Sequence, residues 1–195
     1  MLTENQLVSH LRDIGAVRKK HVVLVGGRHS DDYVDLELLF PRTALFSTVC
    51  RSLALECLDM REAEVIIGPE RGATYLAPRL AEKLGERCCG REILSLDARK
   101  GARGKFFIPE HLEPLVAGKK VLGIDDVLTT GRSLRKTLDL AEKLGGTVIG
   151  ACCVWNRGGV TADELGVPRL ASLINILLPS WEAAVCTNPK CRLLL

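Results

Sequence analysis

The chain has 195 residues, 47% of them hydrophobic and 26% charged, which is typical of one globular domain with a substantial core. Its net charge of +3 is too small and dispersed to indicate nucleic-acid binding, although it suits an anionic substrate. No apolar run reaches the roughly 18 residues of a membrane helix, and the polar N-terminus does not resemble a signal peptide. We therefore expect a single cytoplasmic domain, residues 1–195, without nucleic-acid or membrane partners.

The first part of the chain predicts a helix followed by a hairpin. Thr3 and Gln6 form a capping box ahead of apolar residues at helical spacing. The runs 21–25 and 33–39 flank the turn sequence GGRHSDD, so they predict two antiparallel strands. Residues 42–58 return to helical spacing and predict a second helix.

From residue 65 onward, short apolar runs alternate with helical patterns. The runs are residues 65–68, 93–96, 121–124 and 148–154, and the helical patterns are residues 73–84 and 134–144. This alternation predicts a parallel sheet covered by helices on both faces. Because ligands bind such sheets beyond the carboxyl ends of the strands, the loops that follow these runs are the candidate site.

The most informative stretch is residues 121–133, VLGIDDVLTTGRS. Gly131 permits a tight turn, and the free amides at the start of the next helix favour phosphate. Two adjacent carboxylates would repel an anion unless they accept hydrogen bonds from hydroxyl groups or face a metal. A ribose 5-phosphate satisfies both requirements; the alternative is an ordinary helix cap and loop. The candidate binding residues are Asp125, Asp126, Val127, Leu128, Thr129, Thr130, Gly131, Arg132 and Ser133.

Three further loops carry candidate residues. Residues 68–73, GPERGA, predict a second anion-binding turn. Residues 97–109 predict a mobile basic flap that can close over a site and stabilise developing negative charge. The alternative is a run of charged residues that is simply exposed to solvent. Arg157 follows the last strand and can fork onto a planar carboxylate or imide. The residues of the turn are Pro69, Glu70, Arg71 and Gly72, and the cations of the flap are Arg99, Lys100, Arg103 and Lys105.

Residues 121–133 strongly resemble the 5-phosphoribosyl 1-diphosphate (PRPP) signature of type I phosphoribosyltransferases. In that family the paired acids hold the ribose hydroxyls, and the TTGxS loop holds the 5-phosphate. Four other stretches resemble the orotate phosphoribosyltransferases in particular. They are GGRHSDDYVD at 26–35 (their hood segment), GPERG at 68–72 (diphosphate loop), RKGARGK at 99–105 (flexible loop) and WNRGG at 155–159 (orotate-contacting arginine).

The resemblance implies a type I phosphoribosyltransferase-like α/β fold, with a core of about 42–160 and a small hood of about 1–41 plus 161–195. It implies transfer of the phosphoribosyl group from PRPP to orotate, giving orotidine 5-phosphate and diphosphate in pyrimidine biosynthesis. The implied cofactor is Mg²⁺, held through PRPP near the paired acids, and the implied assembly is a homodimer that shares its catalytic flap. The family pattern assigns base binding to His29, Tyr33, Thr129 and Arg157.

Several positions depart from the family pattern. In the flap, Arg103 replaces a lysine, Lys105 replaces a histidine and Phe106 replaces a glycine, while Asn156 replaces the usual aspartate before the arginine. These departures leave two alternatives open, a purine phosphoribosyltransferase and a non-catalytic PRPP-binding regulator. The altered flap favours the regulator, whereas the lack of a basic stripe or an added nucleic-acid-binding domain argues against it.

The eight cysteines form no C-x-x-C pair, and without a secretion signal most of them are interpreted as small buried hydrophobes. A zinc site built on Cys186 and Cys191 would need two further ligands. None lies near them in the sequence, so the sequence alone does not favour such a site.

Overall fold

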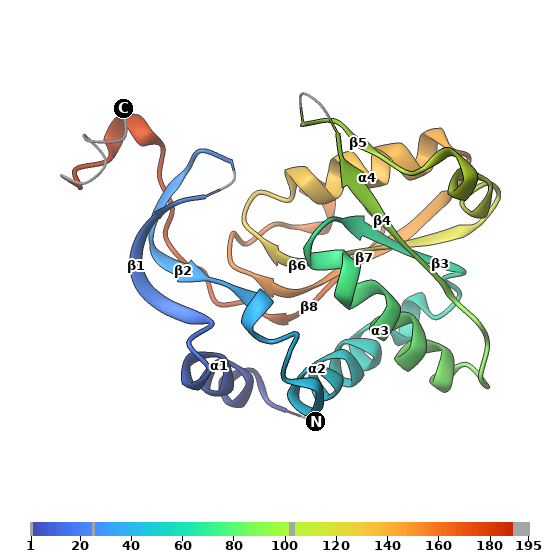
Figure 1. The fold of residues 1–195 in the computed structure, drawn as a ribbon, viewed down its shortest axis with the longest axis horizontal. Helices are drawn as coiled ribbons and strands as arrows, with labels where there is room; N and C mark the ends of the chain where they lie inside the picture. The colour runs from blue at the N-terminus through green and yellow to red at the C-terminus, as the bar shows by residue number, and fades with distance from the viewer. Residues whose placement is uncertain (1, 25, 102–103, 189–195) are drawn as a thin grey trace.

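A computed structural model of the chain describes residues 2–24, 26–101 and 104–188. Its centre is a six-stranded sheet in the order β5-β4-β3-β6-β7-β8 (Figure 1), in which all strands run parallel except β5. The strands are β3 (Val65–Pro69), β4 (Leu94–Lys100), β5 (Phe106–Phe107), β6 (Lys120–Leu128), β7 (Thr147–Asn156) and β8 (Leu170–Ile174). The predicted parallel sheet is therefore confirmed.

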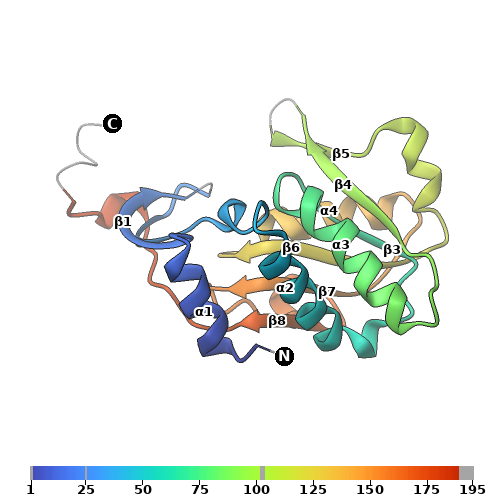
Figure 2. The ribbon, with the colours of Figure 1, turned by 60° about the horizontal axis from the view of Figure 1, so that its bottom comes forward.

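Helices cover both faces of this sheet (Figure 2). The side chain of Ile66 packs into the cluster that contains the apolar residues of α2 and α3, whereas Val65 and Ile67 pack with those of α4. Because successive side chains of a strand point to opposite faces, this partition shows that the sheet is buried on both sides. The covering helices are α2 (Thr43–Glu56), α3 (Gly72–Arg87), α4 (Arg132–Lys143) and the short α5 (Ala162–Leu165).

A hood is built from both ends of the chain. Helix α1 (Glu4–Asp13) begins with the predicted capping box of Thr3 and Gln6, and it leads into the antiparallel hairpin of β1 (Val17–Val23) and β2 (His29–Val34). The segment after β8 runs back along this hairpin (Figure 1). It is joined there by two backbone hydrogen bonds of 2.7 and 2.9 Å between His29 and Trp181. The hood thus faces the side of the sheet where β6 and β7 end.

Three elements differ from the sequence-based expectation. The second hairpin strand ends at Val34, and the following residues form a 3-10 turn, Leu36–Leu38, that buries Leu36. Part of the segment assigned to the hood, Leu170–Ile174, instead forms the edge strand β8, because its apolar residues pack onto β7 and α2. The basic flap is an arm of β4 and β5 rather than an irregular loop. Within the described residues, further 3-10 turns span Leu58–Met60, Glu110–Leu115 and Ala183–Val185.

Four cysteines are buried in the core, as predicted: Cys50, Cys57, Cys152 and Cys153. Burial raises the pKa of the Cys50 thiol to about 12, so it stays protonated and behaves as a small apolar side chain.

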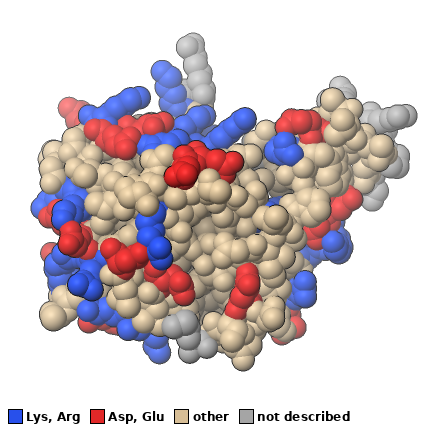
Figure 3. All heavy atoms as spheres, turned by 180° about the vertical axis from the view of Figure 1, so that it is seen from behind, with Lys and Arg blue, Asp and Glu red and all other residues tan. Residues whose placement is uncertain are grey.

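None of the helices in the described part of the chain is long and apolar enough to cross a membrane. On the face seen in Figure 3, basic and acidic side chains are interspersed around a broad area of uncharged residues.

Candidate active site

The loop between β6 and α4 forms an anion cradle, here defined as residues 129–133. Gly131 is the N-cap of α4 and has a left-handed φ of +68°, a conformation that glycine adopts without strain. Among the described residues, no side chain caps this helix, so its first amides keep their hydrogen-bonding capacity for a ligand. The cradle therefore offers backbone N–H groups and a helix N-terminus to a phosphate.

Two carboxylates stand beside the cradle, because β6 continues through Asp125 and Asp126 to Leu128. The amide of Asp126 donates to Oδ1 of Asp125 (2.9 Å), and the amide of Val127 donates to Oδ1 of Asp126 (2.7 Å). Burial raises the pKa of both carboxyl groups, and the charge of Asp126 raises that of Asp125 further. Neither carboxylate has an ion-pair partner within the described part of the chain. Such a pair fits hydroxyl donors or a divalent cation.

The turn of residues 69–72, predicted to bind an anion and here called the diphosphate turn after that prediction, packs directly against this pair. A Cβ on Gly72 would lie 2.7 Å from Cγ of Asp126, so only glycine allows the start of α3 to approach the carboxylate. The neighbouring Glu70 accepts a hydrogen bond of 2.9 Å from the amide of Lys100, which connects the turn to the basic arm. Arg71 is exposed and pairs with Glu37 at 3.6 Å. The turn and the acids thus form one continuous surface.

The basic arm consists of the end of β4 and its antiparallel partner β5, with Gly101 donating to the carbonyl of Lys105 at 2.8 Å. Figures 1 and 2 show the arm projecting beyond the rest of the sheet. The side chains of Arg99, Lys100 and Lys105 are exposed. Arg103, the remaining cation predicted for this arm, lies outside the described residues.

Arg157 is buried beneath the hood, with only 1% of its surface exposed. Its guanidinium donates to the carbonyl of Asp32 (3.0 Å) and to Oγ of Ser30 (2.7 Å), both in β2. Its Nε is buried and has no hydrogen-bond partner among the described residues. Burial lowers the pKa of Arg157, and the nearby charge of Asp32 opposes that shift. The guanidinium is therefore fixed in place and retains N–H groups for a ligand.

A cavity of about 400 Å³ joins Arg157 to the anion cradle. A Cβ on Gly158 would lie 1.7 Å from the carbonyl oxygen of Thr129, so the loops after β6 and β7 are in direct contact. Residues lining the cavity include Arg28, Thr129, Thr130, Arg157, Gly158 and Pro179. A second depression, of about 590 Å³, lies at the opposite, amino ends of the strands, where Glu64 pairs with Lys119. It is remote from all the predicted motifs.

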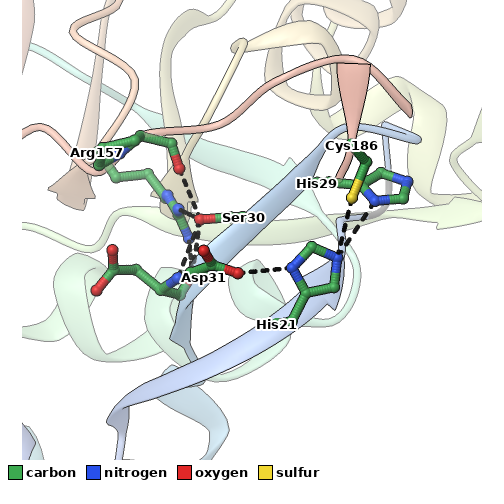
Figure 4. A network of polar contacts seen from close by, with 8 residues as sticks. His21, His29, Ser30, Asp31, Arg157 and Cys186 are labelled. Atoms are coloured by element: carbon green, nitrogen blue, oxygen red, sulfur yellow. Dashed lines mark hydrogen bonds and ion pairs between the residues drawn. The ribbon is translucent and has the colours of Figure 1, made fainter. Parts of the chain in front are cut away.

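The structure brings together the cradle, the paired acids, the diphosphate turn and Arg157, but it separates two of the predicted base-binding residues from them. The ring of His29 faces His21 and Cys186 (Figure 4), and Tyr33 packs under the guanidinium of Arg18 at 5.2 Å. Sequence reasoning missed Ser30, whose hydroxyl holds Arg157 and donates to the carbonyl of Pro179 at 2.7 Å. The position of Ser30 within the GGRHSDDY motif is the sequence feature that could have indicated this role.

Asn156 is a second residue whose role the sequence did not indicate. Its side-chain amide donates to the carbonyl of Val160 (2.8 Å), and its oxygen accepts from the amide of Val160 (2.9 Å). This reciprocal pair closes the turn that carries Arg157. An ionised aspartate could make only the second of these bonds, because it has no donor.

Comparisons with known proteins agree with this arrangement. The family of the phosphoribosyl transferase domain matches residues 42–182. The chain is 31% identical to the orotate phosphoribosyltransferase of Caulobacter vibrioides over 93% of this chain and 89% of that protein. The structure of the Mycobacterium tuberculosis orotate phosphoribosyltransferase superposes with a TM-score of 0.68 at 26% identity, over 88% of this chain and 95% of that one. The same enzyme in complex with PRPP gives 0.58 at 26% identity, over 72% and 79%.

Proposed function

Because this chain belongs to the orotate phosphoribosyltransferase family of type I phosphoribosyltransferases, we infer that it transfers the 5-phosphoribosyl group of PRPP to orotate. The products are orotidine 5-phosphate and diphosphate. One observation supports this function most strongly: the phosphate cradle, with a pair of acids beside it on β6, shares a cavity with a fixed, buried arginine. The first two features suit a phosphorylated ribose, and the third suits a planar carboxylated base.

PRPP is proposed to bind with its 5-phosphate in the cradle and its ribose hydroxyls donating to Asp125 and Asp126. Oδ1 of each carboxylate accepts a hydrogen bond from a neighbouring backbone amide, and neither group has an ion-pair partner in the described part of the chain. Their remaining lone pairs are therefore available to the hydroxyl groups. The diphosphate then extends over residues 69–72, which pack against Asp126.

The reaction joins a ring nitrogen of orotate to C1 of the ribose while the bond from C1 to the diphosphate oxygen breaks. The bonding electrons leave with the diphosphate, and an oxocarbenium-like state develops at C1. Orotate is acidic enough at this nitrogen to release the N–H proton to water, so the step needs no strong general base. The protein therefore acts by holding both substrates in line and by stabilising the departing charge. Arg99, Lys100, Arg103 and Lys105 are proposed to supply that charge stabilisation.

Magnesium is the cofactor that the family implies, and the paired acids fit it. Mg²⁺ binds through one or two carboxylates plus substrate phosphates rather than in a full protein cage. Burial raises the pKa of both carboxyl groups, and hydrogen bonds from backbone amides offset only part of this shift. They would hold the ion together with PRPP, and the ion would neutralise charge on the diphosphate.

The proposed assembly is a cytoplasmic homodimer in which each basic arm reaches its partner's site. The arm supports this proposal because Arg99, Lys100 and Lys105 are exposed and because the arm projects beyond its own sheet (Figure 2).

A diphosphate-release assay with PRPP and Mg²⁺ tests the proposed function directly. The bases are orotate, uracil, adenine, guanine, hypoxanthine and xanthine, each at the same concentration. We expect rapid release with orotate and little with the other bases. Faster release with a purine would make the chain a purine phosphoribosyltransferase. PRPP binding without release for any base would make it a regulator.

A further inference from the structure

Two histidines and a cysteine converge on the side of the hood that faces away from Arg157 (Figure 4). Nε2 of His21 lies 3.4 Å from Nδ1 of His29 and 3.6 Å from Sγ of Cys186. All three candidate ligand atoms lie within 4.8 Å of one another. We propose that these residues bind a transition-metal ion, Zn²⁺ by preference, and that the ion fastens the C-terminal segment to the hairpin.

The two separations that involve Nε2 of His21 match those between ligands of one tetrahedral ion. With Zn–N of about 2.0–2.1 Å and Zn–S of about 2.3 Å, tetrahedral geometry places two nitrogens about 3.3 Å apart and nitrogen and sulfur about 3.6 Å apart. The distances of 3.4 Å between Nε2 of His21 and Nδ1 of His29 and of 3.6 Å between Nε2 of His21 and Sγ of Cys186 agree with these values. A hydrogen bond between the imidazoles would instead favour about 2.7–3.2 Å, shorter than the 3.4 Å found.

The surroundings of His21 also suit a metal ligand. Its Nδ1 lies 2.6 Å from Oδ1 of Asp31, so the carboxylate accepts a hydrogen bond from Nδ1–H, and Nε2 is the nitrogen directed at the cluster. A carboxylate behind a ligating histidine is the usual means of fixing its tautomer and ring orientation. Trp181 covers the other side, with its ring 6.1 Å from that of His21. Both histidines are largely shielded from solvent.

The ligands come from three segments that only the folded hood brings together. His21 lies in the register irregularity of β1, where a bulge redirects side chains, and His29 begins β2. Cys186 follows the segment that pairs with His29 through Trp181. A soft thiolate with two imidazoles is a donor set that favours Zn²⁺ over Mg²⁺.

The ion would act at a distance from the reacting atoms. Its C-terminal anchor, residues 180–186, continues from Pro179, whose carbonyl accepts from Ser30. Ser30 in turn holds Arg157, so a metal clamp would stiffen the cover of the base cavity. Metal binding does not depend on the proposed transferase activity. A negative result for the metal site therefore does not refute the proposed function, and the reverse also holds.

Metal content and cobalt spectroscopy of the full chain, after removal of any purification tag, test the proposal. We expect about one Zn²⁺ per chain as isolated. After chelation, Co²⁺ should produce a thiolate-to-metal charge-transfer band and the intense visible bands of a tetrahedral site. Cys186→Ser should abolish the charge-transfer band, whereas Cys89→Ser, which removes an exposed thiol elsewhere, should keep it.

Two further variants separate a metal site from a structural cluster. Asp31→Asn should weaken Co²⁺ affinity about 10- to 100-fold by releasing the orientation of His21. His10→Ala, which removes an exposed histidine on α1, is the matched control for His21→Ala and should leave Co²⁺ affinity unchanged. The proposal is overturned if wild-type protein shows no thiolate band with Co²⁺, if the band survives Cys186→Ser, or if His21→Ala binds as tightly as wild type. The wild-type measurement remains decisive should a variant fail to fold.

Discussion

Replacing Asp125 and Asp126 with asparagine should weaken PRPP binding and stabilise the ligand-free protein at the same time. The loss of binding follows from the proposed contacts to the ribose hydroxyls. A hydrogen bond to a charged group contributes about 1.5–3 kcal/mol, so each replacement should cost about 10- to 150-fold in PRPP affinity. The fold should survive, because an asparagine oxygen can still accept from the amides of Asp126 and Val127.

The gain in stability follows from the pKa shifts. Burial raises the pKa of both carboxyl groups above the ordinary 3.8 of aspartate, so the folded state binds their protons more tightly than the unfolded state. Their contribution to stability is therefore greatest below that value, and it is lost as the pH rises through the folded-state pKa. At pH 7 the variant should unfold at a higher temperature than wild type, and this advantage should shrink towards pH 4.

Calorimetry measures both effects, by titration with PRPP and by thermal scans across pH. Asp13→Asn, at an exposed position on α1, is the matched control and should change neither quantity. Unchanged PRPP affinity in the double variant would refute the role assigned to the acids. A lower unfolding temperature at every pH would refute the reasoning from burial.

Three other changes probe separate parts of the site. Chains carrying Arg99→Ala, mixed with chains carrying Asp125→Asn, should regain turnover because heterodimers contain one intact site; no recovery despite proven subunit exchange would exclude a shared arm. Asn156→Asp should lower the free energy of unfolding by about 1–3 kcal/mol in denaturant titrations, since the carbonyl of Val160 loses its donor; wild-type stability would contradict this. Gly158→Ala should raise the KM for PRPP by displacing the cradle, because its Cβ would lie 1.7 Å from a backbone oxygen; an unchanged KM would show that the loops adjust freely.

Local patterns predicted the central sheet and the cradle well, because their signals are contiguous in the sequence. The capping box at Thr3, the strand–turn–helix around Gly131 and the alternation of buried strands with helices each depend on neighbouring residues. The apolar runs predict that two strands end at residues 96 and 124, whereas β4 continues to Lys100 and β6 to Leu128. Charged residues there continue the strands because backbone pairing with the adjacent strands extends beyond the apolar stretch.

Features that depend on distant segments could not be predicted in this way. The pairing of Trp181 with His29 closes the hood and buries Arg157, which the sequence presented as a residue at an open edge. The same pairing turns His29 towards His21 and Cys186. Hydrophobic periodicity reports which face of an element is buried, but it does not report which remote segment covers that face.

The claim that Arg157 selects orotate is the centre of this account, and initial-rate kinetics of Arg157→Ala test it most directly. Loss of a forked, charged contact worth about 2–4 kcal/mol should reduce kcat/KM for orotate about thirty- to several-hundred-fold. The KM for PRPP should barely change, and Arg157→Lys should recover little, because an ammonium cannot reproduce the planar fork. Orotate kinetics equal to those of wild type in Arg157→Ala would contradict the assignment.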